Sequence, residues 1–368
     1  MSTREQTLRL ATRGSALALT QAKMVKNRLR TRRLSVELVE VNTTGDEIRD
    51  ELIHRLGTTG AFVRSLDEKV LAGELDGSVH SMKDMPTEQP EELVIAGVPE
   101  RAPAGDVLVT PDGLTLEELP EGATVGTSSL RRGAQLQAAR PDLTIEGLRG
   151  NVDTRVEKLL APSLQRERDK RVEADREGSS EETPDEEFDR SPEEWFESLT
   201  EREQAALERD IDTEYDAICL AEAGLARSGL LSEVNFQRLD PYAFVPAAAQ
   251  GAIAITALDG ETAELIHDRL DHPPTRVEIT TERTILAELG GGCVAPVGIH
   301  AKLQGDIVAT TVRVLSRDGS EEIKESRDLP VASHAEAASA FAQDLADRGA
   351  ADLIEQARRE EPDEPKRE

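Results

Sequence analysis

Segments with the character of β-strands and α-helices alternate from the start of the chain, and this alternation restricts the fold more than any other feature. TLRLAT (7–12) has the length and apolar content of a strand, and residues 15–30 follow it as an amphipathic helix opened by Ser15. The next strand is expected at 35–42, the next helix at 62–74, and further strands at 77–84, 93–98 and 106–110. This order predicts an α/β fold with a largely parallel sheet, whose ligand sites lie at strand ends and helix N-termini.

A second α/β unit and a smaller C-terminal α+β unit follow. In the second unit, strands are expected at 123–128 and 144–151, helices at 130–141 and 152–160, and a buried strand that runs into a helix over 215–225. The last hundred residues contain a helix at 281–292 that ends in glycines, strands within 297–303 and 307–316, and one or two helices over 333–357.

Residues 161–210 interrupt this pattern. Acidic side chains outnumber basic ones there by 18 to 8, and no apolar periodicity is visible. The segment is predicted to be a solvated insertion, either disordered or loosely helical over 191–210, with no catalytic part. Trp195 and Phe196 are the side chains that could dock it on the body of the protein.

The composition limits the partners of this chain. Its 73 acidic and 44 basic residues give a net charge of −29, which disfavours nucleic acid and anionic membranes as partners. Such an acidic surplus is typical of proteins from salt-loving organisms, where salt screens the repulsion. The two cysteines cannot form a disulfide framework, and the sequence shows neither an export leader nor a long apolar run. We therefore expect a cytoplasmic protein.

Lys83 and Asp84 lie side by side at the end of a predicted strand, just before Pro86. Strand ends are where α/β proteins place functional groups, so a paired cation and carboxylate here indicates a site. The motif by itself fits a surface ion pair at least as well.

Arginines gather at predicted helix starts. GTSSLRRG (126–133) brings a glycine, three hydroxyls and two guanidiniums to a strand-to-helix corner, where backbone N–H groups can receive an anion. LRGNVDTR (148–155) and ATRGS (11–15) repeat this design, and a solvated basic turn is the alternative for each. In so acidic a chain, these arginines predict a ligand with several carboxylates or phosphates. No nucleotide-binding motif of the GxGxxG or GxxxxGK[ST] type is present.

Cys293 lies on a glycine-rich loop after a helix, whereas Cys219 lies within an apolar strand. A thiol on such a loop is a candidate nucleophile or attachment point. The histidines show no metal-binding spacing, so we expect no metal, and His80 is interpreted as a packed core residue.

Seven motifs occur in the order and approximate spacing of porphobilinogen deaminases, and the chain is similar to that family over nearly its whole length except 161–210. The motifs are ATRGS (11–15), TTGD (43–46), VHSMKD (79–84), GTSSLRR (126–132), LRGNVDTR (148–155), AQGAIAI (249–255) and GGCVAPVG (291–298). The presence of VHSMKD, GTSSLRR and LRGN in one chain is highly specific. Combined with the acidic surplus, the resemblance indicates a halophilic archaeal source.

The resemblance implies three domains and no partner subunit. Domains 1 and 2 would resemble the two lobes of type II periplasmic binding proteins with the active-site cleft between them, and domain 3 would be a smaller α+β domain that carries the cysteine loop. The expected ranges are 1–100 with 251–270, then 105–245 including the insertion, then 273–368. A monomer is the family expectation.

The implied activity is the deamination and head-to-tail condensation of four porphobilinogen molecules on a covalent dipyrromethane cofactor, followed by hydrolysis to hydroxymethylbilane. By resemblance, Cys293 forms the thioether to the cofactor, and Asp84 is the catalytic carboxylate that stabilises charge on the pyrrole nitrogens. The implied cofactor-binding residues are Lys83, Asp84, Thr127, Ser128, Ser129, Arg131 and Arg132. The implied substrate-binding residues are Arg13, Ser15, Arg149, Arg155 and Arg227.

Two segments depart from the family pattern. Thr58 and Thr59 stand where many relatives have a glycine and a lysine, and Arg55 is a possible substitute for the missing cation. Gly105 stands where relatives often place an arginine before the aspartate, which puts a contact near the hinge in doubt. The alternatives to an enzyme are a periplasmic-type binding module, which would need neither Asp84 nor a loop cysteine, and a degenerate structural relative.

Overall fold

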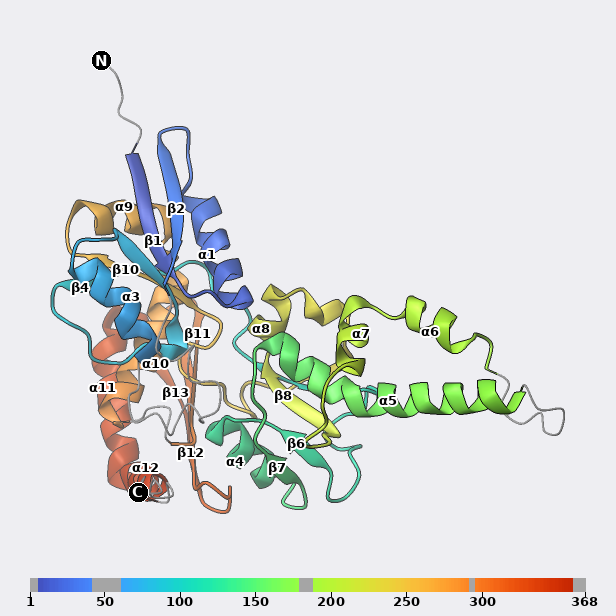
Figure 1. The fold of residues 1–368 in the computed structure, drawn as a ribbon. Helices are drawn as coiled ribbons and strands as arrows, with labels where there is room; N and C mark the ends of the chain where they lie inside the picture. Colours follow the sequence, from blue (N-terminus) through green and yellow to red (C-terminus); the bar gives the residue numbers. More distant parts are fainter. Residues whose placement is uncertain (1–5, 42–60, 179–187, 291–294, 360–368) are drawn as a thin grey trace, which may run out of the picture.

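The computed structural model describes residues 6–41, 61–178, 188–290 and 295–359. Over these residues the strands form three sheets, each with its own covering helices (Figure 1). The sheets correspond in sequence to the two α/β units and the α+β unit expected above. Among the described helices, none has both the length and the apolar character needed to cross a membrane.

The first sheet is built from both ends of the α/β part of the chain. Its strands are β1 (Gln6–Thr12), β2 (Leu34–Glu40), β3 (Gly77–Ser81), β4 (Leu93–Gly97) and β10 (Ile253–Leu258), in the order β2-β1-β3-β10-β4. Its helices are α1 (Ala16–Leu29), α3 (Ala61–Leu71) and α9 (Glu261–Leu270). β1 is parallel to β2 and β3, whereas β10 is antiparallel to both of its neighbours.

The second sheet repeats this plan. Its strands are β5 (Asp106–Val109), β6 (Thr124–Gly126), β7 (Thr144–Glu146), β8 (Ala217–Ala221) and β9 (Phe236–Arg238), in the order β7-β6-β8-β5-β9. Helices α4 (Leu130–Ala139), α5 (Val152–Gly178) and α8 (Glu222–Arg227) belong to it. Each sheet has four strands that run in one direction and one that runs against them, β10 in the first sheet and β5 in the second, so both sheets are largely parallel as predicted. Each antiparallel strand follows a segment in which the chain crosses from one sheet to the other. The chain passes between the sheets twice, through 98–105 and 239–252.

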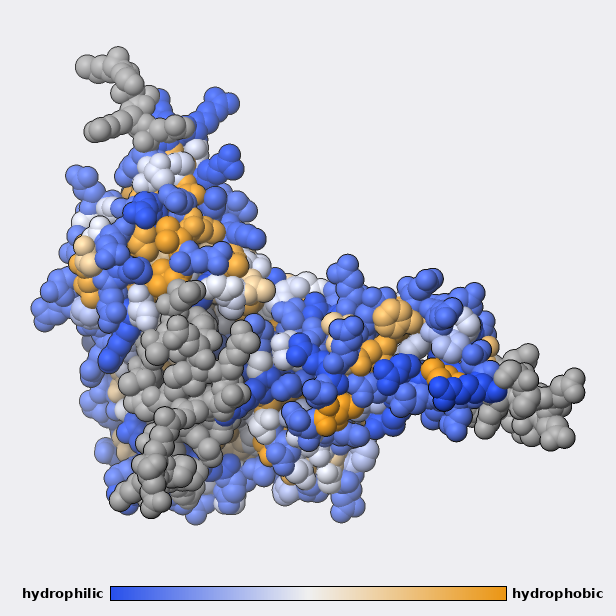
Figure 2. All heavy atoms as spheres, viewed as in Figure 1, coloured by the Kyte–Doolittle hydropathy of each residue, from blue (hydrophilic) through white to orange (hydrophobic). Residues whose placement is uncertain are grey.

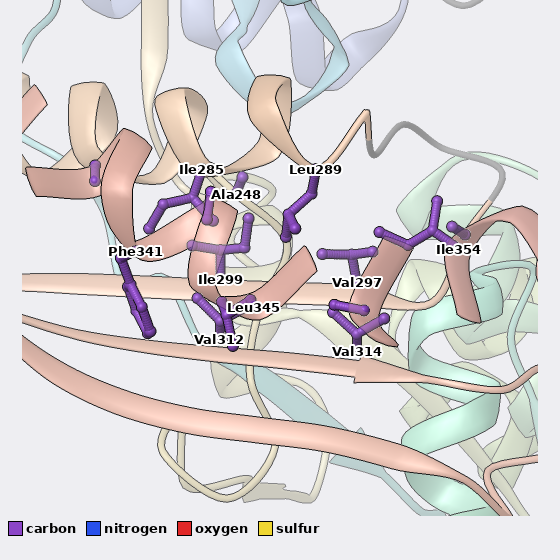
Figure 3. Packing of buried hydrophobic residues seen from close by; sticks show 14 of the residues in the cluster. Ala248, Ile285, Leu289, Val297, Ile299, Val312, Val314, Phe341, Leu345 and Ile354 are labelled. Carbon is purple, nitrogen blue, oxygen red and sulfur yellow. The ribbon is translucent and has the colours of Figure 1, made fainter. Parts of the chain in front are cut away.

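The third unit packs helices on a three-stranded antiparallel sheet. It contains α10 (Pro273–Glu288), β11 (Val297–Gln304), β12 (Ile307–Leu315), β13 (Glu322–Pro330), α11 (His334–Leu345) and α12 (Ala351–Arg359). Its core lies between the helices and the sheet, where Ile285, Ile299 and Phe341 are fully buried (Figure 3). α10 begins at Pro273 rather than at 281, because His272 caps it and its first turns pack against the rest of the protein.

The predicted insertion is helical rather than disordered over most of its described part. α5 does not end near residue 160 but continues to Gly178, and α6 (Pro192–Ser198) and α7 (Glu201–Leu207) lie along it to form an arm (Figure 1). Both short helices begin with a complete capping box. Trp195, on α6, is buried and packs against Arg171 of α5, so it joins two helices of the arm to each other rather than the arm to the body of the protein. Hydrophilic residues cover most of the arm in Figure 2.

Candidate functional site

The Lys83–Asp84 pair lies on a single 3-10 turn, Met82–Asp84, that directly follows β3. Met82 and Met85 are buried on either side of the pair, whereas Lys83 is half-buried and Asp84 is exposed. Burial lowers the pKa of Lys83, the charge of Asp84 opposes this, and the cations Arg132 and Arg131 lower it further. Lys83 of the first unit therefore lies close enough to the arginines of the second unit to sense their charge.

The hydroxyls of GTSSLRRG shape the corner between β6 and α4. Ser129 caps α4, since its Oγ accepts the Arg132 backbone N–H at 3.5 Å. Thr127 Oγ1 accepts the Ser129 backbone N–H at 3.2 Å. Ser128 Oγ donates to the Leu148 carbonyl at 2.6 Å, which ties this corner to the loop that carries the next arginines. Ser128 thus ties the two corners together, while Thr127 and Ser129 stabilise the start of α4.

Arg131 and Arg132 turn inward and share the carboxylate of Asp106. Arg131 Nη1 lies 2.8 Å from Asp106 Oδ2, and Arg132 Nη2 lies 2.8 Å from Oδ1. All three side chains are buried. Burial by itself would raise the pKa of Asp106, but the two guanidiniums lower it to about 2. Two cations against one anion leave one positive charge in this buried cluster.

Gln250 connects this cluster to both crossings between the sheets. Its Nε2 donates to Asp106 Oδ1 at 2.9 Å and to the Ala104 carbonyl at 2.7 Å, and its Oε1 accepts from Arg132 at 3.2 Å. Sequence reasoning missed Asp106 and Gln250. The sequence does contain one indication of the role of Asp106. It is a carboxylate at the start of a buried apolar strand, and a buried charge needs partners.

Arg101 occupies the crossing where Gly105 departs from the family pattern. Its Nη1 and Nη2 donate to both carboxylate oxygens of Glu282 at 2.8 and 2.9 Å, and its Nε donates to the Gln250 carbonyl at 2.8 Å. Glu282, on α10, also accepts the backbone N–H groups of Ala249 and Ala301. A buried arginine therefore does contact the residues of this crossing, but it lies four residues before Gly105, the position at which the family pattern places an arginine.

Two of the predicted substrate-binding arginines of the second unit, Arg155 and Arg227, lie near the same cluster. Arg155 Nε donates to the Gly150 carbonyl at 2.8 Å, and burial and the charge of Arg132 lower its pKa to about 10. Arg227 Nη2 donates to the Gly251 carbonyl at 2.6 Å, in the second crossing. Arg13 is half-buried after β1, and Ser15 caps α1, which packs against α8.

Three buried guanidinium nitrogens of the second α/β unit have no hydrogen-bond acceptor within the described residues: Arg131 Nε, Arg149 Nη1 and Arg227 Nε. Arg317 Nη2, in the third unit, is a further buried nitrogen of this kind. Buried N–H groups in native proteins are nearly always paired. Donors left open at several arginines therefore fit a ligand that carries more than one carboxylate. No group of three His, Cys, Asp or Glu that could hold a metal occurs in the described ranges.

The other predicted positions have different outcomes. Cys293 lies outside the described residues, as do Arg55, Thr58 and Thr59. Cys219 is buried in β8, and burial raises the pKa of its thiol to about 12. His80 is a core residue, as predicted: its Nε2 lies 2.9 Å from Asp67 Oδ1.

Comparison with known proteins gives a consistent picture. A family model described as the dipyromethane cofactor binding domain of porphobilinogen deaminase matches residues 8–166 and 201–265, and the C-terminal domain model of the same family matches 276–348. The gap between 166 and 201 falls on the arm.

Among curated proteins, a probable porphobilinogen deaminase of Halobacterium salinarum is 51% identical over 96% of this chain and 99% of its own length. A porphobilinogen deaminase of an Exiguobacterium species is 37% identical over 86% of this chain and 88% of its own length. Among solved structures, the ectoine-binding protein TeaA matches with a TM-score of 0.34 at 10% identity, over 96% of this chain and 98% of its own.

Proposed function

The chain belongs to the porphobilinogen deaminase family, and we propose that it condenses four porphobilinogen molecules head to tail with loss of ammonia and releases hydroxymethylbilane for tetrapyrrole biosynthesis. The observation that carries this proposal is the set of buried guanidinium nitrogens without acceptors on three arginines of the second unit, together with the exposed Asp84 next to Lys83, whose charge is influenced by Arg131 and Arg132. A single carboxylate and several open cationic donors suit a substrate with a reactive nitrogen heterocycle and two acid side chains. The same membership disfavours the binding-module alternative.

The residues present fit the dipyrromethane that the family model names. Lys83, Asp84, Thr127, Ser128, Ser129, Arg131 and Arg132 would hold it, and Cys293 would be its covalent attachment point. When bound, this group supplies the pyrrole carbon on which the chain is extended. The support for this assignment is the net positive charge of the Asp106 cluster and its open Arg131 Nε.

Asp84 is proposed as the catalytic carboxylate. Its side chain is exposed at the end of β3, while its two methionine neighbours are buried, so the carboxylate faces away from the core of the first unit. A carboxylate there can accept pyrrole N–H bonds and stabilise positive charge as it develops on the ring. It can also take up or return a proton during condensation.

Arg13, Ser15, Arg149, Arg155 and Arg227 are proposed to bind substrate carboxylates. Arg149 and Arg227 each keep a buried nitrogen without an acceptor, which supports this role. A charge-assisted hydrogen bond contributes about 1.5–3 kcal/mol. Because each incoming porphobilinogen brings two acid arms, several such contacts are needed for every addition.

We propose the three-domain division predicted above, since each predicted range contains one sheet. We also propose a cytoplasmic monomer that works at high salt and binds neither nucleic acid nor membrane. The net charge of −29 and the similarity to the Halobacterium salinarum protein support the salt preference.

The decisive experiment measures the intact mass and counts the thiols. The purified chain should exceed 40.1 kDa by two condensed porphobilinogen units. In denaturant one thiol, that of Cys219, should react, because a thioether blocks Cys293. Cys293→Ala should lose the mass excess and still show one thiol. Two reactive thiols in an active, unmodified wild-type chain would refute the attachment.

Asp84→Asn tests the catalytic role with a side chain of the same shape. We expect product formation to fall by at least about 100-fold, since a lost general acid–base contribution alone is worth that much. The variant should unfold at the same denaturant concentration as the wild type, because Asp84 is exposed. Ammonia release at the wild-type rate would contradict the role.

A further inference from the structure

We propose that Arg283, on α10 of the third unit, is a positioning residue that holds the Asp84 turn in place for the reaction. This inference rests on the proposed function, because it assigns Arg283 to act through Asp84. Neither the motifs nor the composition singled out this arginine.

Arg283 donates hydrogen bonds to backbone carbonyls on both sides of the Lys83–Asp84 pair. Its Nη2 donates to the Pro86 carbonyl at 2.7 Å, and its Nη1 donates to the carbonyls of Met85 at 3.2 Å and Met82 at 3.5 Å. Burial lowers the pKa of this guanidinium, and the described residues offer it no carboxylate partner. A planar group with several N–H donors suits a cluster of carbonyls.

The same face of α10 also packs against the turn. Ile279 precedes Arg283 by four positions, so both side chains lie on one side of the helix. Ile279 belongs to a buried cluster with Met82 and Met85, the residues that flank Lys83 and Asp84. Apolar contacts thus fix the side chains of the turn, and Arg283 fixes its backbone. Only Lys83 and Asp84 are left to face outward.

α10 also leads directly to the proposed attachment point. The helix ends at Glu288, and Cys293 follows five residues later in the sequence. One helix therefore holds the turn that bears the proposed catalytic carboxylate and precedes the cysteine closely in the sequence. Because a displacement of about 1 Å can lower an enzyme's rate about 100-fold, holding the Asp84 turn against this helix has a direct catalytic value.

Arg276 provides a matched control on the same helix. Its Nη2 also donates to a backbone carbonyl of the first unit, that of Ile95 at 3.2 Å, but in β4 rather than in the Asp84 turn. It also pairs with Asp271, so Arg276→Ala should cost at least as much stability as Arg283→Ala. If α10 served only to dock the units, the two variants would behave alike.

The experiment compares Arg283→Ala, Arg283→Lys and Arg276→Ala in the full chain, with rates divided by the fraction of molecules that carry the mass excess. We expect Arg283→Ala to lower kcat by about 10- to 100-fold with KM changed less than about threefold. Arg283→Lys should recover part of kcat, and Arg276→Ala should retain it within about threefold. Hydrogen exchange should speed up in a peptide spanning residues 82–88 only in Arg283→Ala.

A second arm places Arg283→Ala in an Asp84→Glu background. In Asp84→Glu the longer side chain has already displaced the carboxylate from its position. If Arg283 acts through Asp84, adding Arg283→Ala should then lower kcat by less than about threefold relative to Asp84→Glu alone. Equal losses of kcat in Arg276→Ala and Arg283→Ala, or full additivity with Asp84→Glu, would overturn the inference. A wild-type chain that makes no hydroxymethylbilane would instead overturn the proposed function.

Discussion

Asp106→Asn should destabilise the protein in a way that depends on pH, because it removes the carboxylate that pairs with both buried arginines while preserving the side-chain shape. Asp106 is fully buried between Arg131 and Arg132, and these guanidiniums lower its pKa from 3.8 to about 2. A shift of that size corresponds to about 2 kcal/mol, and leaving two buried cations unpaired brings the expected loss at pH 7 to about 3 kcal/mol.

The sign of the pH dependence follows from linkage. The folded pKa of Asp106 lies below its unfolded value, so its contribution is complete above 3.8 and is lost as the pH falls toward 2. The wild type should therefore lose about 1 kcal/mol of this advantage between pH 6 and pH 3. The variant, which has no carboxylate there, should not show that loss. The difference between the two proteins should shrink by the same amount.

Urea unfolding at constant high salt, followed by circular dichroism at pH 7, 6, 4 and 3, measures this difference. Asp142→Asn is the control, since its pairing with Arg140 lies at the surface and should matter much less. A difference between wild type and Asp106→Asn that is near zero at pH 7, or that stays constant down to pH 3, would refute the electrostatic account of the cluster.

Three further predictions concern backbone strain, salt and chain growth. Gly251→Ala should cost about 2 kcal/mol or more, because its φ is 86° and a Cβ would lie 2.5 Å from the Ala102 carbonyl oxygen; Gly122→Ala, at φ 77° with open space, should cost clearly less in the same urea titration. Raising salt from 0.1 to 2 M should raise the melting temperature, since the net charge of −29 is then screened; an unchanged melting temperature would contradict this. Arg149→Ala and Arg227→Ala should each slow turnover and accumulate one enzyme-bound intermediate, visible by intact mass; normal rates would rule out their role.

Several elements could be predicted from local pattern alone. Ser15 opens α1 as the capping preference indicated, and the segment Gly77–Ser81 is a strand followed at once by the Lys83–Asp84 turn. The same reasoning failed for β13, where alternation is expressed mostly by polar residues on an edge strand. It also failed for the length of α5, because beyond residue 160 the helix has polar contacts rather than an apolar stripe. Gln165 donates to the Leu207 carbonyl of α7, and Arg171 pairs with Glu167.

The strand and helix order, the acidic surface and the motifs that place this chain in its family could be inferred from the amino-acid order, because each of these is encoded in neighbouring residues. The folded chain was needed to show that Arg131 and Arg132 share Asp106, that Gln250 connects them to both crossings, and that Arg283 binds the backbone of the Asp84 turn. These partners are distant in sequence, and nothing local records which buried donor will meet which acceptor. These groups become buried only when the chain has crossed between its sheets. A buried polar group without a hydrogen-bond partner then costs free energy, so the pairing is set by the folded structure.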